Sequence, residues 1–340
     1  MDEIGVASFG LYLPKATVSN EEIGNEFQIP PDIVLNKQGL KRKHISSSSE
    51  MPSDMGFYAA NEAIQKFVEA GYSKNDIGAL MYIGSQWKDY NLWLISTNLQ
   101  ERLGLRNAYS FDVSAMCAGM VMGLNLAKGM LMANKNIRSV LLVGASKESF
   151  IVNPKNRSTS WMDDFADAGV AAIVSRDAKG NKIMESEFLT DGSLSQAALI
   201  VPGGAKVPSF RNYCEADRPY IESLISKDEF KKKMEAVSLN NFKKVIEKSV
   251  EKSGITMSEV KMVFLNHMKP SFHRSLLDSL GIGPDRSVYL EEYGHSQSAD
   301  QFIGLNVALE EGKFEKGYIV FAAAGTGYVW GSTVIKWGEK

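Results

Sequence analysis

The segment Phe-Asp-Val-Ser-Ala-Met-Cys-Ala-Gly-Met, residues 111–120, contains the change from an extended run to a helix rich in Met, Leu and Ala. Cys117 lies at this junction. Backbone N–H groups in the first turn of a helix have no intrahelical partner, and the helix dipole places partial positive charge there, so a thiolate is favoured over a thiol. Cys117 is therefore a candidate nucleophile. The alternative is a small buried hydrophobic side chain, which is the usual fate of a free cysteine.

Strand-like and helix-like segments alternate on both sides of this junction, a pattern typical of α/β proteins. The first pass predicts strands at residues 4–9, 79–83, 109–113 and 140–144, and helices at residues 53–70, 91–103 and 117–133. The second pass predicts helices at residues 228–253, 270–280 and 298–311, and strands at residues 260–266 and 318–324. This order predicts two similar halves, residues 1–180 and 181–340. Residues 191–227 contain Gly203-Gly204 and several prolines and are expected to form a loop region.

Composition narrows the class of protein. A chain of 340 residues, 44% of them hydrophobic, exceeds the usual size of one domain and can bury a large core. The net charge is −2, and the densest basic cluster, Lys41-Arg42-Lys43-His44, is too short to follow a phosphate backbone, so we expect no nucleic-acid partner. No apolar run reaches the ~20 residues that span a bilayer, so we expect a cytoplasmic protein without a membrane segment. Cys117 and Cys214 are too far apart in sequence to predict a disulfide framework or a zinc site.

Four histidines are candidate bases for the thiol of Cys117. We expect His267 and His295 just after strands of the second half, and in an open α/β sheet functional groups gather at the carboxyl ends of strands. Both are therefore expected to converge on the thiol, although each can instead be a structural histidine. His273 lies within a predicted helix, where a partly buried structural role is expected, and His44 belongs to a basic loop and is expected to be solvated.

Several short motifs follow one another in a fixed order along the chain. They are Asp-Val-x-x-x-Cys-Ala-Gly at residues 112–119, a basic loop at residues 39–45, an Arg-bearing loop at residues 153–157, a run of small residues at 166–171, a His motif at residues 267–270 and a Gly-rich turn and strand at residues 325–332. Their combination resembles the β-ketoacyl-acyl-carrier-protein synthase III family of the thiolase superfamily. The resemblance runs nearly end to end.

This resemblance implies a thiolase-like α/β fold, in which two similar halves form a layered α-β-α-β-α core, and an acyltransferase of the 3-oxoacyl-acyl-carrier-protein synthase III type. Cys117 would take an acyl group from an acyl-CoA or acyl-carrier-protein thioester and condense it with a malonyl-type thioester. The backbone N–H groups of Cys117 and Thr326 would form the oxyanion hole. His267 would hydrogen-bond the thioester carbonyl of the second substrate. His295 stands where the family has Asn and is expected to serve condensation more than acylation.

The resemblance also implies substrate contacts and an assembly. The residues expected to bind substrate are Lys37, Trp87, Trp93 and Arg157. Ile33 stands where the family often has a Trp that stacks on the CoA adenine. The two tryptophans can instead belong to a dimer contact, because aromatic residues dominate both settings. We expect a homodimer with acyl carrier protein as partner, no cofactor and no metal, and a role in fatty acid biosynthesis or in polyketide or secondary-metabolite biosynthesis.

Two departures from the family pattern leave other functions open. His295 replaces Asn, and Met268-Lys269-Pro270 replaces the Gln-Ala-Asn that usually follows the first catalytic His. One alternative keeps the acyl-Cys intermediate but delivers the acyl group to a hydroxyl or amine in secondary metabolism, with His267 or His295 as base. Another is a non-catalytic ketosynthase-like partner subunit, against which the intact Cys117 and two candidate bases argue.

Overall fold

The computed structural model describes residues 3–207 and 219–338, and its centre is a nine-stranded mixed sheet. In spatial order the strands are β5 (Tyr109–Asp112), β4 (Ile77–Tyr82), β6 (Ser139–Lys147), β7 (Asp167–Ser175), β1 (Gly5–Tyr12), β8 (Lys182–Thr190), β11 (Val329–Trp337), β10 (Gly317–Gly325) and β9 (Val260–Leu265). Cys214 and part of the loop region expected at residues 191–227 lie outside the described residues.

The same strand arrangement occurs twice. In the first half β4 and β6 are parallel, while β7 runs antiparallel to both β6 and β1. In the second half β9 and β10 are parallel, while β11 runs antiparallel to both β10 and β8. Among the described residues, β5 alone has no counterpart strand in the second half. At the corresponding place beside β9, Ser287 makes only a single isolated bridge to Val263. The division at residue 180 stays a prediction, although β8 begins just after it.

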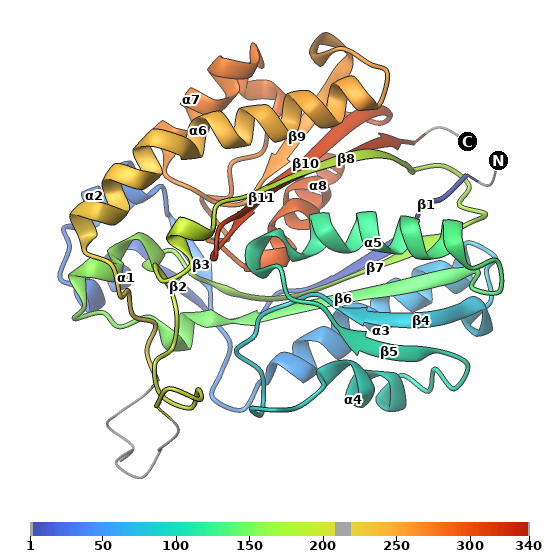
Figure 1. Ribbon diagram of the computed structural model, residues 1–340, viewed down its shortest axis with the longest axis horizontal. Coiled ribbons are helices and arrows are strands. Elements are labelled where there is room, and N and C mark those ends of the chain that lie inside the picture. Colours follow the sequence, from blue (N-terminus) through green and yellow to red (C-terminus); the bar gives the residue numbers. More distant parts are fainter. Residues whose placement is uncertain (1–2, 208–218, 339–340) are drawn as a thin grey trace.

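Helices separate and cover the two parts of the sheet (Figure 1). The long helices are α3 (Pro52–Glu69), α4 (Ile95–Arg102), α5 (Gly119–Ala133), α6 (Lys227–Lys252), α7 (Pro270–Leu280) and α8 (Asp300–Glu310). One core cluster joins α5 and α8 to both parts of the sheet. A second joins α3 and α4 to the outer face of the first part, and a third joins α6 and α7 to the outer face of the second. The layered α-β-α-β-α core expected from the sequence is therefore confirmed.

Shorter elements connect these layers. They are α1 (Asn20–Phe27), α2 (Pro31–Ile33), a π-helical turn (Val34–Gln38), the paired strands β2 (Thr17–Ser19) and β3 (Arg42–His44), and 3-10 turns at Lys74–Asp76, Met116–Ala118, Glu148–Ile151, Arg157–Met162, Gly192–Leu194, Met257–Glu259, Pro284–Arg286 and Gln297–Ala299. A separate apolar cluster joins α1 and the π-helical turn to residues 151–165.

The segment Met116–Ala133 is apolar and long enough, by length and composition alone, to cross a membrane. Half of it is buried inside the molecule, because α5 lies between the two parts of the sheet. A helix buried in a core has the same apolar composition as a membrane span. From the sequence we expected no membrane span. Among the described residues, this is the one segment with the length and composition of a span.

Candidate active site

Cys117 lies in the 3-10 turn Met116–Ala118, directly before α5 and only 4% exposed. The turn is tight, and Met116 has a φ of 48°, in the left-handed region that non-glycine residues rarely adopt. Gly119 lets the start of α5 approach the end of β4, because a Cβ there would lie 2.0 Å from the Ile83 carbonyl oxygen. The thiol is thus held at a helix start, as the sequence predicted.

The imidazole of His295 lies against the thiol. Its Nε2 is 3.1 Å from Cys117 Sγ, and its Nδ1 is 2.6 Å from Asp300 Oδ2. A carboxylate only accepts, so Nδ1 carries the proton and Nε2 is free to accept one from the thiol. Asp300 is fully buried, and its Oδ1 accepts a 2.7 Å hydrogen bond from the Ser296 backbone N–H. Cys117, His295 and Asp300 therefore have the geometry of a nucleophile, a base and an orienting acid.

Electrostatics couple this triad. Burial raises the pKa of Cys117, and the charge and hydrogen bond of His295 only partly offset it. Desolvation of the buried thiol thus opposes the thiolate that the helix start is expected to favour. Burial opposes protonation of His295 as well, but the charges of Cys117 and Asp300 raise the pKa of His295 well above its usual value. The proton thus moves between sulfur and imidazole, and the thiolate forms together with the imidazolium.

His267 follows β9, as predicted, but its ring is held by other groups. Its Nδ1 is 2.7 Å from Asp164 Oδ2, and its Nε2 lies 3.3 Å from the Gly39 carbonyl oxygen and 3.4 Å from the Tyr289 hydroxyl. Among the described residues these are the polar contacts of the ring, and Cys117 is not one of them. The His267 backbone N–H donates to Asp300 Oδ2 over 2.8 Å, so Asp300 connects the two histidines.

Asp164 contacts both histidines, one through its backbone carbonyl and the other through its carboxylate. Its carbonyl accepts a 2.9 Å hydrogen bond from the His295 backbone N–H, and the Ala166 N–H donates to the His295 carbonyl over 2.8 Å. Its carboxylate faces His267, and although burial would raise the pKa of Asp164, the hydrogen bond and charge of His267 lower it. His295 was expected just after a strand. Instead, its position is set by the β-bridge between His295 and Phe165, which precedes β7, and by the left-handed Gly294 (φ 74°).

The Gly-rich turn at residues 325–327 passes close to the backbone of Cys117. A Cβ on Gly325 would lie 3.1 Å from the Cys117 nitrogen and 2.5 Å from the Ala115 carbonyl oxygen, so only glycine permits this approach. Thr326, the next residue, lines the adjacent cavity. The backbone N–H groups expected to form the oxyanion hole, those of Cys117 and Thr326, therefore belong to two segments in contact.

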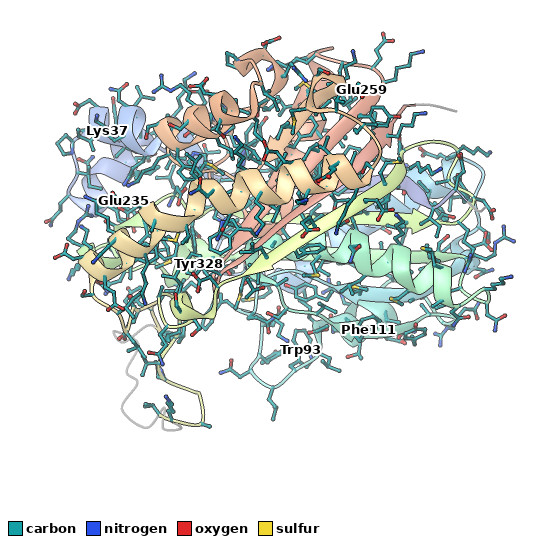
Figure 2. The ribbon with its side chains drawn as sticks, turned by 45° about the horizontal axis from the view of Figure 1, so that its top comes forward. Lys37, Trp93, Phe111, Glu235, Glu259 and Tyr328 are labelled. Carbon is teal, nitrogen blue, oxygen red and sulfur yellow. The ribbon has the colours of Figure 1, made fainter. Side chains whose placement is uncertain are left out.

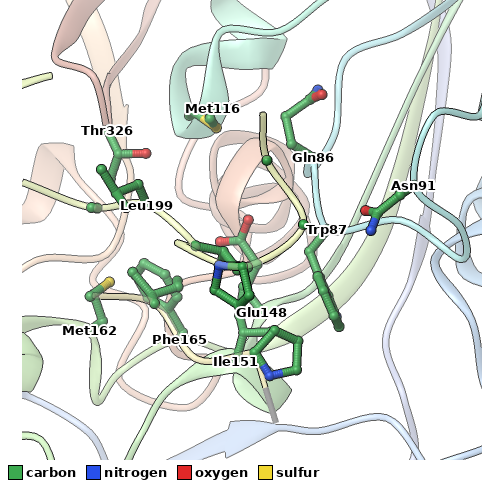
Figure 3. A pocket seen from close by; sticks show the side chains of 17 residues that line it. Gln86, Trp87, Asn91, Met116, Glu148, Ile151, Met162, Phe165, Leu199 and Thr326 are labelled. Atoms are coloured by element: carbon green, nitrogen blue, oxygen red, sulfur yellow. The ribbon is translucent and has the colours of Figure 1, made fainter. Parts of the chain in front are cut away.

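A cavity of about 330 Å³ lies beside the triad (Figure 3). The described side chains that line it are mostly apolar and include Trp87, Met116, Ile151, Met162, Phe165, Leu199, Ile200 and Ile221, with Gln86, Asn91, Glu148 and Thr326 as polar members. Met116 and Thr326 flank the nucleophile, and the Phe165 ring lies 5.3 Å from the His295 ring. The cavity is therefore lined by residues next to the triad, although Cys117 and His295 themselves are not among them.

Of the four residues expected to bind substrate, Trp87 lines this cavity and the other three lie elsewhere. Trp93 packs edge-on against Tyr90, with ring centroids 5.4 Å apart. The guanidinium of Arg157 lies 3.6 Å from Asp163 Oδ2. Lys37 is exposed on the π-helical turn (Figure 2). The last two are surface groups that a carrier can reach, so their role in binding stays a prediction.

Sequence reasoning missed three acids at this site: Asp300 and Glu148, which are buried, and Asp164, which is partly buried. Asp300 lies five positions after His295, a spacing that alone does not show a hydrogen bond. Asp164 and Glu148 belong to the first half of the chain, and only the packing of the halves brings Asp164 to His267. In the described residues, no cluster of His, Cys, Asp and Glu suited to a metal ion is found.

Comparison with known proteins identifies the architecture. The family model for 3-oxoacyl-[acyl-carrier-protein] synthase III matches residues 111–192, and the model for the C-terminal part of the same enzyme matches residues 250–337. The chain is 26% identical over 343 residues to the beta-ketoacyl-[acyl-carrier-protein] synthase III of Campylobacter fetus, with all of both chains covered. It is 28% identical to the synthase of the same name from Aliarcobacter butzleri, which covers 97% of this chain and 96% of the relative.

A solved structure has the same fold. The 3-oxoacyl-[acyl-carrier-protein] synthase III of Aquifex aeolicus superposes with a TM-score of 0.83 at 23% identity, covering 98% of this chain and all of that one. The matched family segments contain Cys117, His267 and His295. The catalytic roles of these three side chains stay predictions.

Proposed function

The chain belongs to the 3-oxoacyl-[acyl-carrier-protein] synthase III family, and on that premise we propose that it condenses a Cys117-bound acyl group with a malonyl-type thioester. The observation that carries the proposal is the Cys117–His295–Asp300 triad, with distances of 3.1 Å and 2.6 Å between its members. A non-catalytic partner subunit would not need a buried carboxylate aligned behind a base on the thiol.

The first half-reaction loads the acyl group. His295 Nε2 takes the proton of the Cys117 thiol, and the sulfur attacks the carbonyl carbon of an acyl-CoA or acyl-carrier-protein thioester. The backbone N–H groups of Cys117 and Thr326 stabilise the oxyanion. When the intermediate collapses, the carbon–sulfur bond to the carrier breaks, and the protonated His295 gives its proton to the departing thiolate. Asp300 stabilises the imidazolium throughout this step.

The second half-reaction forms the new carbon–carbon bond. The malonyl thioester loses carbon dioxide, and the electron pair of the broken bond forms an enolate. The enolate carbon attacks the acyl carbonyl and displaces the Cys117 thiolate, which takes up a proton from solvent by way of His295. His267 donates from Nε2 to the enolate oxygen, and the Asp164 carboxylate at Nδ1 orients the ring.

The product tests this proposal. Purified protein is incubated with a short acyl-CoA and malonyl-acyl carrier protein, and the reaction is followed by mass spectrometry of the carrier and by release of carbon dioxide. We expect a 3-oxoacyl carrier thioester and one carbon dioxide per product. Decarboxylation without a condensed product, or a product that still forms in Cys117→Ala, would rule the condensation out.

One observation favours a second candidate, acyl transfer to a hydroxyl or amine in secondary metabolism. A histidine with a carboxylate behind it is a strong general base, and such a base can deprotonate an alcohol as well as a thiol. The contact of His295 with the sulfur also supports a role in acylation, whereas the sequence favoured condensation. If the wild type never consumes malonyl thioester but esterifies an added alcohol, this candidate replaces condensation.

We also propose a cytoplasmic homodimer that receives its substrates from acyl carrier protein. Edge strand β5 and the adjoining segments expose large apolar side chains: Tyr90, Leu92, Leu94, Tyr109 and Met132. A second copy of the chain would cover such a surface and pair the open strand edge. Light scattering during gel filtration should give twice the monomer mass, and Tyr109→Lys should lower it. A monomeric wild type would contradict the dimer.

A further inference from the structure

Among the described residues that line the cavity beside Cys117, one side chain is acidic. Glu148 is 8% exposed and begins the 3-10 turn that follows β6. Figure 3 shows it among the apolar side chains of Trp87, Ile151 and Phe165. None of the described residues that line the cavity is Lys or Arg. The carboxyl group therefore has no positive partner among the described lining residues.

One carboxyl oxygen of Glu148 is held in place, while the other is free. Oε1 accepts a 2.6 Å hydrogen bond from Ser85 Oγ and a 2.7 Å hydrogen bond from Gln297 Nε2. No hydrogen bond reaches Oε2 from any residue that the structure describes. Burial raises the pKa of Glu148, an effect that the Ser85 hydrogen bond only partly offsets. A carboxylate oxygen that opens onto an apolar cavity is satisfied when a ligand in the cavity donates a hydrogen bond to it.

We propose that Glu148 selects an acyl group bearing a hydroxyl or amino group, which donates a hydrogen bond to Oε2 inside the cavity. This inference rests on the proposed function, in which the acyl group on Cys117 enters this cavity. Met116 and Thr326, which flank the nucleophile, line the same cavity as Glu148, so an acyl chain that extends from the sulfur into this cavity shares it with the carboxyl group. A chain of methylene groups would leave the carboxyl group buried without a partner.

Matched acyl donors test the selection. One set of CoA thioesters carries 3-hydroxypropanoyl, 3-aminopropanoyl and butanoyl groups, and a longer set carries 6-hydroxyhexanoyl, 6-aminohexanoyl and heptanoyl groups. The rate of mass gain at Cys117 is measured for each. We expect the hydroxyl or amino donor of at least one set to react about tenfold or more faster than its alkyl partner, because an unpaired buried polar group penalises the alkyl chain.

Two substitutions assign the preference to the carboxyl group. Glu148→Leu should reverse it, so that the alkyl donor of each set reacts fastest. Glu148→Gln keeps the shape and a hydrogen-bonding group, and it should retain the preference for hydroxyl while losing any preference for amine. Alkyl donors that react fastest with the wild type at both lengths, or a polar preference that survives in Glu148→Leu, would overturn the inference. If no donor adds mass to Cys117, the proposed function fails instead.

Discussion

At the scale of the residue, each of the two histidines is hydrogen-bonded to a carboxylate, but the two rings lie in different positions relative to the sulfur. Each Nδ1 faces a carboxylate, Asp300 behind His295 and Asp164 behind His267. Only His295 contacts the sulfur, so the two pairs can serve different half-reactions. Cys117 and both histidines were predicted from the sequence, because a helix-start cysteine and histidines in ordered motifs are readable patterns. The two aspartates were not, because an acid that faces a histidine in space looks in sequence like any surface acid.

Replacing Asp300 separates the two half-reactions. Asp300→Asn removes the charge that stabilises the His295 imidazolium, so acylation of Cys117 should slow by roughly 10- to 100-fold. The measurement is the rate of acyl-enzyme formation by quenched-flow mass spectrometry. The matched control is Asp164→Asn, which should acylate nearly as fast as the wild type but condense more slowly. Equal loss of acylation in both variants would show that the carboxylates do not have separate roles.

Replacing His295 tests its contact with the thiol. From the sequence, where His295 is expected to serve condensation, His295→Asn should preserve acylation. In the structure, however, His295 is the one base among the described contacts of the buried thiol. We expect His295→Asn to acylate about 100-fold more slowly than the wild type, since a positioned base typically contributes at least that factor. Unchanged acylation in His295→Asn would contradict the role of His295 as the base for the thiol and would leave it a role in the condensing step alone.

At the scale of the element, strongly periodic segments were predictable and fully buried ones were harder to assign. Helices α3, α5, α6 and α7 and strands β4, β9 and β10 lie where the sequence places them, within a few residues. Strands β7 and β8 were not predicted as strands. β7 is buried at every position and rich in Ala and Gly, so it lacks the alternation that marks a half-buried strand. β8 is polar and only partly buried, and its pairing with β11 is a long-range contact.

The close approach of α5 to β4 can be tested with two glycines on the same helix. A Cβ on Gly119 would lie 2.0 Å from the Ile83 carbonyl oxygen, whereas a Cβ on Gly129 would have no described atom within 4 Å. Gly119→Ala should therefore lower stability by about 2 kcal/mol or more, through overpacking against the backbone. Gly129→Ala should raise it by roughly 0.5–1 kcal/mol, because alanine favours the helix. Thermal unfolding of both variants checks this, and equal effects would contradict the packing account.

At the scale of the whole molecule, the site exists only when the two halves pack together. The nucleophile and Asp164 come from the first half, while both histidines, Asp300 and the Gly-rich turn come from the second. The central layer of α5 and α8 fixes their relative positions. The layered architecture was predictable from the order of elements and the motifs, but the distances across this layer depend on packing and were not.

The stability of the molecule should depend on pH through His273, which is buried on α7. Burial lowers the pKa of His273 to about 4, from an ordinary value of 6.5. Between these values the unfolded chain binds a proton that the folded chain does not, so stability falls as the pH falls. Urea unfolding should show a loss of about 2 kcal/mol from this group between pH 7 and pH 5. His273→Phe should remove that part of the pH dependence. An identical loss in this variant and the wild type would contradict it.

The most direct measurement of the central claim follows the mass of the intact protein in a pulse and chase. Incubation with an acyl-CoA should add one acyl group, which peptide mapping locates at Cys117, and the chase with malonyl-acyl carrier protein should return the protein to its original mass as the 3-oxoacyl carrier appears. Cys117→Ala should gain no mass. A wild type that gains no mass, or an acyl group located on another residue, would contradict the account.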